Sequence, residues 1–382
     1  MRIYFADIPD GHAAWLRLWE RSDGREVFAH PGYAGLWADD RTRACAAVYE
    51  SNGARVLYPF LLRDITKEPF GRPVAGPAFD VISPYGYGGP AAVWPRGSAV
   101  PSDGEKEKLY KGFYAAFHAW AAENHVVSEF VRFSLFSEAR PWYDGHVAHH
   151  NDNIVARLDV PAEELWRGFR HKVRKNVRTA REHGLRVVAD ERGERLEDFL
   201  KVYHDTMKRR RASQAYFFSS GFFRGLLEGV PGGAVFFHVL SDGQVVASEL
   251  VLCARGRVYS FLGGTLRNFY PMRPGDLLKV HIMEWAREKG FREFVIGGGY
   301  RPHDGIFAFK RAFAPDGIVP FFVGKRVFDP EKYRRLCEAA GRPAGGAVGE
   351  SAGKSVARFA LGAADVSAGE LYGEGFFPAY RG

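Results

Sequence analysis

Cysteine is scarce in this sequence, and long apolar runs are absent from it. The three cysteines, Cys45, Cys253 and Cys337, are far apart and odd in number, which argues against a disulfide framework and against a zinc site. No apolar run reaches the roughly 18–20 residues of a membrane-spanning helix. The first residues, MRIYFADIPDGH, lack a basic leader followed by a long apolar run. We therefore expect a cytoplasmic protein with no signal peptide, no membrane span and no metal.

The composition is typical of a globular protein with large hydrophobic cores. Of the 382 residues, 46% are hydrophobic, 15% are aromatic and 26% are charged. A chain of this length suits two domains of ordinary size better than one. Lysine and arginine number 53 against 45 aspartates and glutamates, a net charge of +8. This excess of positive charge favours anionic partners.

The first 155 residues mix strand-like stretches with helix-like ones. RACAAVYESNGARVLYPFLLRDI contains two apolar runs joined by the turn pair Asn52-Gly53, which predicts a β-hairpin. KEKLYKGFYAAFHAWAAENH is typical of a helix. FDVISPYGYGGPAAVW, residues 79–94, is rich in glycine, proline and aromatic residues, and it fits a shaped binding loop and a rigid surface turn equally well.

A second domain is expected to begin near Asp159. Asp159 as N-cap, Pro161 in the first turn and two glutamates beside it predict the start of a helix. Further elements follow in the order helix, helix, three strands, helix, strand, helix, strand, an α/β layered pattern. Helices are expected in ERLEDFLKVYHDTMKRRR, SGFFRGLLEG, GDLLKVHIMEWAREKG and DGIFAFKRAFA, and strands in GAVFFHVLS, QVVASELVLCA, RVYSFLGGT, REFVIGGG and VPFFVGKRVF.

The end of the chain is rich in small residues. Residues 341–382 contain ten glycines and nine alanines, which predicts a flexible tail. Its aromatic end, GFFPAYRG, is suited to docking on a domain. GESAGKS is not a phosphate-binding loop, because only three residues separate Gly349 from Gly353 and no strand leads into it.

One stretch of the second domain contains no acidic residue. RGFRHKVRKNVRTAR, residues 167–181, holds seven arginines and lysines, and like charges four apart on a helix repel by roughly 0.2–0.5 kcal/mol per pair. We expect one helix from Pro161 to His183, with Gly184 just past its end. The stripe that packs inward consists of Trp166, Phe169, Val173, Val177 and Ala180. The arginines along one flank of this stripe are Arg167, Arg170, Arg174, Arg178 and Arg181.

Two interpretations of these arginines remain open. A solvated helix face explains Arg178 and Arg181, which lie near the negative end of the helix dipole. Arg170 and Arg174 have no local partner in such a helix. Because the guanidinium group binds phosphate oxygens bidentately, we favour a phosphate-binding surface.

NFYPMRPGDLLKVHIMEW leads from a glycine-ended strand into a helix. Arg273 and the helix N-terminus at Gly275 are suited to a pyrophosphate or a terminal nucleotide phosphate, with an ordinary connection as the alternative. No Ser-His-Asp order, Cys-His pair or HExxH motif is present. Direct attack on an activated ester or thioester, without a covalent intermediate, suits such a sequence.

Lys310 lies in DGIFAFKRAF, on the same helix face as Ile306, Phe309 and Phe313. A lysine in this position either extends past the core or presents its charge to a shielded site. Asp304 is expected as the N-cap of this helix.

Three stretches in this order resemble the Fem-type aminoacyltransferases and their acetyltransferase-like relatives: YHDTMKRRRASQAYFFSSGFF, GDLLKVHIMEWAREKGFREFVIGGG and DGIFAFKRAFAPDG. The basic stretch and SPYGYGGP fit the same pattern, so the resemblance covers residues 30 to 335. It implies tandem domains of the GNAT fold, each a mixed β-sheet flanked by helices. We place these domains at residues 1–155 and 156–335, with the tail at 336–382.

The resemblance also implies a reaction. Fem-type enzymes move an amino acid from aminoacyl-tRNA to an amine, usually on a peptidoglycan precursor, and some relatives act on small amines in antibiotic biosynthesis. It implies charged tRNA as donor and partner, an amine-bearing acceptor and no bound cofactor. The coiled-coil insertion and the uridine-nucleotide recognition of the cell-wall enzymes are not evident here, so the acceptor is not identified.

By this resemblance, Phe309 and Lys310 lie at the aminoacyl end of the donor, where the Lys310 cation favours the developing oxyanion. The residues expected to bind the donor are Arg170, Arg174, Lys175, Arg178 and Arg273, and those expected to bind the acceptor are Tyr85, Tyr87, Arg209 and Arg210. Helix C-terminal charge is the alternative role for the last two.

Two other functions remain as alternatives. The first is an acyl-CoA-dependent N-acyltransferase in polysaccharide or metabolite synthesis, and the second is a non-catalytic RNA-binding protein with the same fold. The arginine-rich flank favours tRNA over CoA. Lys310 on an apolar helix face favours catalysis over binding alone.

Overall fold

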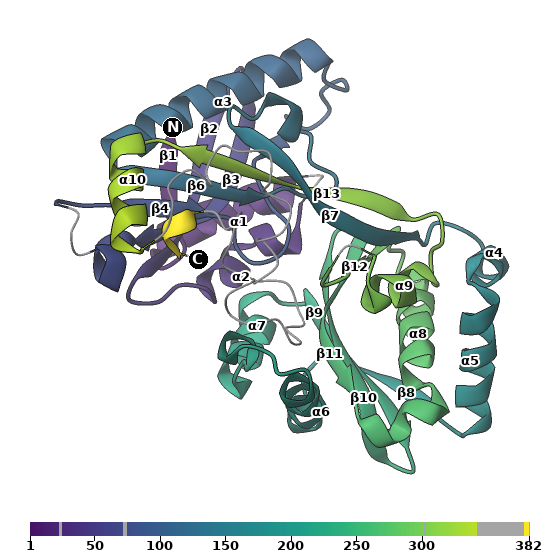
Figure 1. The fold of residues 1–382 in the computed structure, drawn as a ribbon. Coiled ribbons are helices and arrows are strands. Elements are labelled where there is room, and N and C mark those ends of the chain that lie inside the picture. The colour runs from purple at the N-terminus through teal and green to yellow at the C-terminus, as the bar shows by residue number, and fades with distance from the viewer. Residues whose placement is uncertain (23–24, 72–74, 302, 342–377, 382) are drawn as a thin grey trace. The chain divides into compact units, whose positions relative to one another are not determined.

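The computed structural model describes residues 1–22, 25–71, 75–301, 303–341 and 378–381. The chain divides into two compact units (Figure 1). Among the described residues, unit 1 comprises 1–150, 321–341 and 378–381, and unit 2 comprises 151–320. Most of the segment predicted as a tail therefore lies outside the described residues. No helix in the described ranges is long and apolar enough to cross a membrane.

Unit 1 has helices packed on both faces of its strands. Its strands are β1 (Arg2–Phe5), β2 (Thr42–Ser51), β3 (Ala54–Asp64), β4 (Phe79–Ile82), β5 (Ala91–Val93) and β6 (Val126–Arg132). Its helices are α1 (Pro9–Arg21), α2 (Pro31–Gly35), α3 (Asp103–Glu123) and α10 (Pro330–Ala339). One hydrophobic core lies under α3, and a second lies under α1, α2 and α10.

Unit 2 repeats this layered arrangement with a longer set of helices. Its strands are β8 (Arg186–Asp190), β9 (Ala234–Ser241), β10 (Gln244–Ala254), β11 (Arg257–Thr265) and β12 (Glu293–Gly298). Its helices are α4 (Ala162–Gly168), α5 (His171–Glu182), α6 (Leu196–Arg209), α7 (Ser220–Gly229), α8 (Pro274–Glu288) and α9 (Gly305–Arg311). Two further strands, β7 (His146–Arg157) and β13 (Ile318–Val327), carry residues of both units.

The strands of each unit are antiparallel with one parallel pair. Their order is β1-β2-β3-β4-β6-β13 in unit 1, with β5 on β3, and β7-β12-β11-β10-β9-β8 in unit 2. The parallel pairs are β4 with β6 and β11 with β12. A helix lies in the chain between the members of each pair, α3 in unit 1 and α8 in unit 2, as a parallel crossover requires. The α/β pattern of mixed strands flanked by helices is thereby confirmed.

Two strands pair away from their neighbours in the chain. β7 follows β6 in the chain but pairs with β12, and β13 follows α9 but pairs with β6. The sequence predicts neither pairing. Residues 321–335, which the sequence places in the second domain, belong to unit 1.

The hairpin predicted at Asn52-Gly53 is confirmed. Ser51 and Ala54 face each other across β2 and β3, and both turn residues have positive φ, 51° for Asn52 and 80° for Gly53. This is the conformation that two-residue hairpin turns need to match the strand twist.

The basic stretch forms two helices, so the prediction of one continuous helix is wrong. α4 ends at Gly168, and Phe169 and Arg170 are extended, with ψ of 144° and 148°. Tertiary contacts hold this break: the Phe169 ring meets that of Phe313, and the Arg170 N–H donates to the carbonyl of Ala312 at 2.9 Å. The expected inward stripe is otherwise confirmed, because Val173, Val177 and Ala180 are buried.

The predicted N-cap of this region is also wrong. α4 begins at Ala162 with Pro161 in the N-cap position. The Asp159 carboxylate instead accepts a hydrogen bond from the Arg157 guanidinium at 3.1 Å. It is therefore paired with a neighbouring side chain and does not cap α4.

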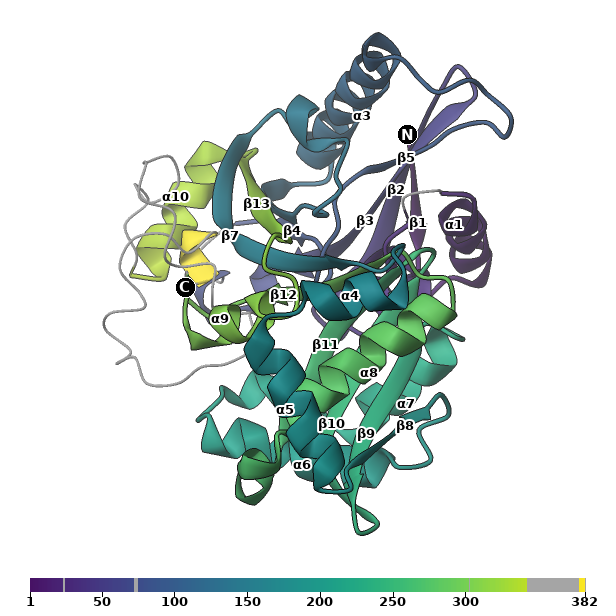
Figure 2. The same ribbon diagram turned by 90° about the vertical axis from the view of Figure 1, so that its right-hand side faces the viewer.

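In unit 2 the helices form layers on either side of the strands. α5 and α8 lie side by side over one face of β9, β10 and β11 (Figure 2), and α6 packs on the other face (Figure 1). The close approach of α6 depends on Gly264 of β11, because a Cβ there would press on Thr206 and lie 2.9 Å from the carbonyl oxygen of Val202.

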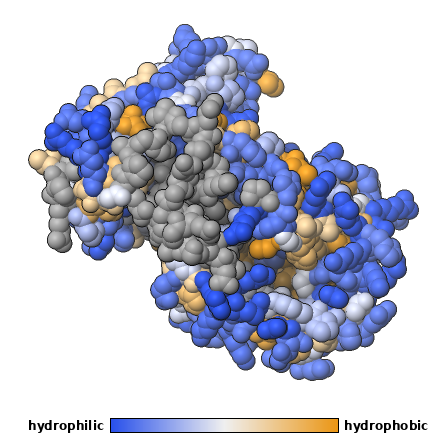
Figure 3. Space-filling view, in the orientation of Figure 1, coloured by the Kyte–Doolittle hydropathy of each residue, from blue (hydrophilic) through white to orange (hydrophobic). Residues whose placement is uncertain are grey.

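The visible surface is mostly hydrophilic (Figure 3). Large apolar side chains that are exposed in the described part of the chain are Met1, Ile8, Val100, Tyr270, Phe309 and Ile318. Of these residues, Phe309 lies on α9, the helix that also contains Lys310.

Candidate active site

β11 and β12 stay paired only at their beginnings. The parallel pairing covers Arg257–Tyr259 and Glu293–Val295, although β11 continues to Thr265 and β12 to Gly298. A bulge interrupts the pairing of β12 with β7 just before Gly297, whose φ is 86°. On the side of β12 that faces β11, backbone groups beyond Val295 can therefore form hydrogen bonds with side chains.

Lys310 uses one of these backbone groups. Its Nζ donates to the carbonyl oxygen of Gly298 at 2.8 Å, so the half-buried lysine of α9 is fixed at the end of β12. Burial, together with the nearby charge of Lys279, lowers the pKa of Lys310 to about 7. Both the ammonium and the neutral amine are consequently populated at neutral pH.

Asp304 fixes the start of the Lys310 helix. Its carboxylate accepts from the backbone N–H groups of Tyr300, Arg301 and Phe307 at 2.8–2.9 Å. A Cβ at Gly299 would collide with this carboxylate, so glycine is required there. The predicted N-cap is confirmed, and it anchors the turn that presents Lys310.

A buried ion pair lies close enough to act on Lys310. Lys279 of α8 donates to Glu249 of β10 at 2.5 Å and to Ser260 Oγ of β11 at 2.7 Å, and the two charged side chains are each 8% exposed. The Lys279 charge lowers the pKa of Lys310, and the Glu249 charge opposes this. The signal in the sequence is one charge inside each of two apolar runs, VVASELVLC and LLKVHIM.

Phe309 is an exposed residue of the Lys310 helix. α9 buries Phe307, 3% exposed, and Phe313 just after it, whereas Phe309 is 39% exposed. The Phe309 ring contacts that of Phe313, and a Cβ on Gly275 would lie 3.9 Å from both Phe309 Cζ and Thr265 Oγ1. The exposed ring therefore lies beside the first turn of α8 and the end of β11.

The first turn of α8 already contains a carboxylate. Arg273, exposed and with φ of 61°, occupies the N-cap position, and Asp276 is buried in the turn that follows. Burial raises the pKa of Asp276, against a hydrogen bond from Asn176 and the charges of Arg273 and Lys172. The acidic side chain of this helix start is therefore buried and hydrogen-bonded to Asn176, while Arg273 is exposed.

The cations of α5 fall into two groups. Arg174 turns back and donates to the carbonyl oxygens of Arg167, at 2.9 Å, and Phe169, so it caps α4 and has the local partners that the sequence does not reveal. Arg170, Lys172, Lys175 and Arg178 are exposed. Because the Arg170 N–H is bonded to Ala312, this exposed group begins near the end of the Lys310 helix.

Arg209 makes contacts within unit 2. Its guanidinium donates to the carbonyl oxygen of Thr265 at 3.0 Å and to Thr206 Oγ1 at 3.2 Å, and it lies over the ring of Tyr270. Arg209 thus ties α6 to the end of β11. Arg210 is exposed at the C-cap of α6.

The two tyrosines predicted for the acceptor belong to unit 1. The carbonyl of Tyr85 accepts from the Tyr33 hydroxyl at 2.6 Å, and the ring of Tyr87 packs edge-on against Phe28 and Phe321. Gly86 between them has φ of 119°, and a Cβ there would collide with Phe28. The SPYGYGGP stretch is therefore a tightly packed loop.

The structure does bring together a serine, a histidine and an aspartate. His238 lies 2.9 Å from Ser248 Oγ through Nδ1 and 3.5 Å from Asp190 through Nε2, a contact that the sequence order does not predict. His238 is fully buried and Ser248 is 1% exposed, and the serine donates to the carbonyl of Phe237. The three residues form a polar link between strands inside the core, with no access for a substrate.

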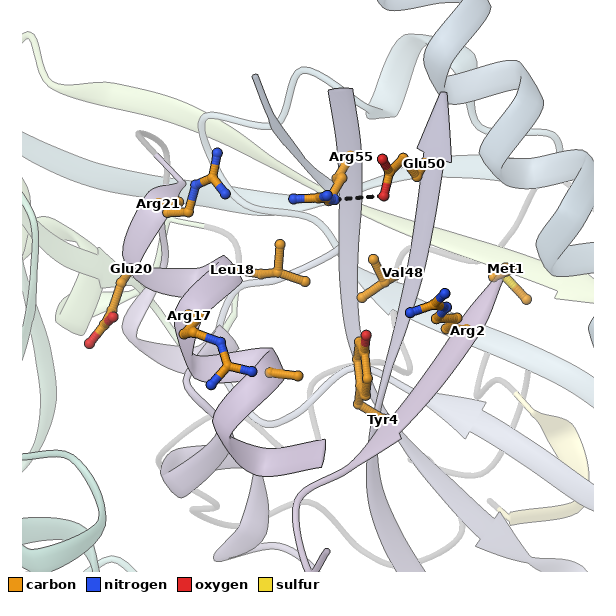
Figure 4. A pocket seen from close by; sticks show the side chains of 11 residues that line it. Met1, Arg2, Tyr4, Arg17, Leu18, Glu20, Arg21, Val48, Glu50 and Arg55 are labelled. Atoms are coloured by element: carbon orange, nitrogen blue, oxygen red, sulfur yellow. Dashed lines mark hydrogen bonds and ion pairs between the residues drawn. The ribbon is translucent and has the colours of Figure 1, made fainter. Parts of the chain in front are cut away.

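A separate open groove of about 700 Å³ lies in unit 1 between α1 and the strands β1, β2 and β3 (Figure 4). Four arginines and two glutamates contribute to its lining, with Arg55 bonded to Glu50 at 2.8 Å. The residues along it include Arg2, Tyr4, Arg17, Leu18, Glu20, Arg21 and Val48. None of the predicted site residues lines this groove.

Comparison with known proteins supports the assignment of the fold. Residues 167–311, which include α5, the buried ion pair and Lys310, match the family model described as Acetyltransferase (GNAT) domain. No curated protein sequence matches the chain. The solved structures described below are each similar to it at low sequence identity.

The crystal structure of FemX is similar with a TM-score of 0.60 and 13% identity, covering 86% of this chain and 96% of that one. L-PGS from Bacillus licheniformis has a TM-score of 0.50 and 15% identity, covering 84% and 92%. The C-terminal domain (DUF2156) of a putative lysylphosphatidylglycerol synthetase from Agrobacterium fabrum has a TM-score of 0.50 and 12% identity, covering 82% and 90%. At these identities the similarities define the fold, which is GNAT-like, and the family match supports an acyltransferase.

Proposed function

We propose that this protein is an amide-forming aminoacyltransferase that moves an amino acid from aminoacyl-tRNA to an amine. The observation that carries this proposal is the position of Lys310: its Nζ is fixed on Gly298 at the separation of β11 and β12, with a pKa of about 7. An amine with that pKa at an otherwise apolar helix face is suited to proton transfer at neutral pH.

The chemistry needs one proton to move between two heteroatoms. The acceptor nitrogen attacks the carbonyl carbon of the aminoacyl ester, and the C–O bond to the terminal ribose breaks as the amide forms. One proton leaves the nitrogen, and one is gained by the ribose oxygen. In this proposal the neutral Lys310 amine accepts the first proton, and its ammonium form supplies the second. The cationic form also favours the developing oxyanion, the role expected from the sequence.

The electrostatics of unit 2 support tRNA as the donor. The exposed cations of α5 extend over a helix of 12 residues, about 18 Å at 1.5 Å per residue, and begin at Arg170 beside the end of α9. Such a row suits successive phosphates of a polynucleotide. Arg273 and Arg210 are further exposed cations of unit 2 that could contact the donor or the acceptor. Arg174, engaged in capping α4, contributes less.

The acceptor is proposed only by class. The family resemblance suggests an amine of a peptidoglycan precursor or of a small secondary metabolite. Tyr85 and Tyr87 are the residues of unit 1 proposed to contribute to acceptor binding, through the parts of their half-buried side chains that remain accessible.

A donor assay tests this function. The full-length protein is incubated with the low-molecular-mass fraction of a cell extract and either bulk tRNA charged with radiolabelled amino acids or radiolabelled acetyl-CoA. We expect label to pass from tRNA into an alkali-stable product, because an amide survives the treatment that hydrolyses the ester. Transfer from acetyl-CoA alone would contradict the proposal.

An acyl-CoA-dependent N-acyltransferase is the second candidate. The description of the matching family model, an acetyltransferase domain, favours it. The exposed cations of α5 oppose it, because they extend over a helix of 12 residues, which suits a polynucleotide better than a single pyrophosphate. Absence of transfer from either donor, with tRNA binding retained, would instead favour the non-catalytic RNA-binding function.

A further inference from the structure

The C-terminal residues Ala379–Arg381 are packed into unit 1. Tyr380 is 1% exposed. Its hydroxyl donates to Asp80 at 3.2 Å and lies 2.7 Å from Ser128 Oγ. Both contacts come from neighbouring positions of the parallel strands β4 and β6, where Asp80 faces Ser128. The Tyr380 hydroxyl therefore contacts one polar side chain on each of these two strands.

Arg381 brings a second guanidinium group to the buried Asp80. Its Nε donates to Asp80 Oδ2 at 2.6 Å, and a terminal nitrogen donates to Glu68 at 3.1 Å. Asp80 is fully buried, and its other oxygen accepts from Arg63 at 2.6 Å. The buried Asp80 is thus bound by two guanidinium groups, while the partly exposed Glu68 also has Arg41 at 3.7 Å. Without Arg381 the buried Asp80 would lose one of its two charged partners, which is costly in a buried position.

Aromatic rings and a backbone bond complete the pocket. The ring of Tyr380 lies 5.7 Å from that of Phe70 and 5.4 Å from that of Tyr333. The Arg381 guanidinium lies over Phe70. The Ala379 N–H donates to the Tyr333 hydroxyl at 3.0 Å, so the main chain of the segment is bound as well as its side chains.

We propose that this pocket of unit 1 is a peptide-binding site for a Tyr–Arg pair and that the C-terminus of the same molecule is its occupant. The chain between Gly341 and Pro378 contains 36 residues, and a covalent link of any kind raises the effective concentration of the Tyr–Arg pair at its own unit 1. A second copy at micromolar concentration competes poorly with that. The site serves to hold residues 379–381 on unit 1, and it does not depend on the proposed transferase function.

Cleavage of the tether tests the proposal in the full-length protein. A specific protease site is inserted between Gly353 and Lys354, the purified protein is cut, and native mass spectrometry together with size-exclusion chromatography measures whether the C-terminal fragment stays bound. We expect the fragment to remain with the body at micromolar concentration and to leave on dilution. Immediate loss of the wild-type fragment would overturn the proposal.

Matched variants separate recognition from general packing. Arg381→Ala is expected to weaken retention of the fragment by about thirty-fold or more, because loss of one partner of a buried charge pair is costly. Tyr380→Phe, which loses only the hydroxyl contacts, is expected to weaken it less. Arg335→Ala is the control: this residue is exposed and paired with Glu331 on α10, so retention should be unchanged. Equal retention of all variants would contradict a Tyr–Arg site.

The uncut protein shows whether the occupant comes from the same molecule. A contact within one molecule does not join two molecules. The uncut protein should therefore keep the mass of a monomer throughout the micromolar range. A dimer that Arg381→Ala converts to monomer would show that the pocket takes the tail of a second copy, and it would overturn the assignment to the same chain.

Discussion

At the scale of single residues, Lys310 links the fold to the proposed chemistry. The sequence identifies it as a lysine among Ile306, Phe309 and Phe313, but not its bond to Gly298 or its pKa of about 7. Both depend on the burial of its nitrogen and on the nearby Lys279, which tertiary structure alone brings close.

The pKa of Lys310 predicts how transfer depends on pH. If the neutral amine accepts the proton, the single-turnover rate should rise through about pH 7 as the ammonium loses its proton, and Lys310→Gln should lack this inflection. Rates are measured with saturating charged tRNA between pH 5.5 and 8.5. A wild-type rate that falls through pH 7 would show that the cation is the active form, as the sequence alone suggests.

Glu129 of unit 1 gives a prediction for stability. Its carboxylate accepts from Tyr58 at 2.7 Å and Tyr143 at 3.0 Å, and burial raises its pKa to about 7. Since the folded state holds this proton more tightly than the unfolded state, the stabilisation is complete below the unfolded pKa near 4.5. It is lost as the pH rises through 7.

Glu129→Gln removes this titration and keeps the shape of the side chain. Between pH 5 and pH 8, the free energy of unfolding of the wild type should fall by about 2 kcal/mol relative to the variant. Urea unfolding at the two pH values measures this. Parallel curves for the two proteins would show that Glu129 does not titrate in this range.

At the scale of elements, the sequence predicts those features that neighbouring residues determine by themselves. The Asn52-Gly53 turn, the Asp304 N-cap and the buried stripe of α5 follow from residue type and spacing. The break between α4 and α5 does not, because the burial of Phe169 and the bond from Arg170 to Ala312 hold it. Gly168 at the end of α4 was the available signal.

The packing of α6 on β11 predicts the effect of a small substitution. Gly264→Ala adds a Cβ that would lie 2.9 Å from the Val202 carbonyl, so α6 must shift, at a cost of about 1–3 kcal/mol. Gly168→Ala is the matched control, because nothing lies within 4 Å of its Cβ and alanine favours the helix. Equal melting temperatures for the two variants would contradict this packing.

The exposed cations of α5 make the donor binding testable. Arg170→Ala, Lys175→Ala and Arg178→Ala combined should weaken tRNA binding and lower the salt slope of log affinity by about 0.7 for each phosphate that the variant no longer binds. Circular dichroism should show an unchanged fold, since these side chains are exposed.

The control for this variant removes Arg2, Arg17 and Arg21 from the groove of unit 1 (Figure 4). It lowers the net charge by the same amount and should leave the slope nearly unchanged. If both triple variants lose affinity equally, net charge rather than α5 explains the binding.

At the scale of the whole molecule, the sequence predicts the class of the fold better than its connections. Alternation of helices and strands indicates an α/β arrangement, and the fold is GNAT-like. Nothing in the residues of β7 and β13 reveals that they pair with β12 and β6, because strand partners are chosen by long-range contacts. For the same reason the sequence does not reveal the ion pair of Glu249 and Lys279, since neither residue identifies its partner.

The single-turnover rate of aminoacyl transfer by wild type and Lys310→Ala, with charged tRNA and acceptor both saturating, tests whether Lys310 is catalytic. We expect a loss of about 10²–10³-fold in rate with little change in tRNA affinity, because Lys310 acts on the reacting atoms rather than on donor binding. A variant that folds normally and transfers within a few-fold of the wild-type rate would show that Lys310 is not catalytic.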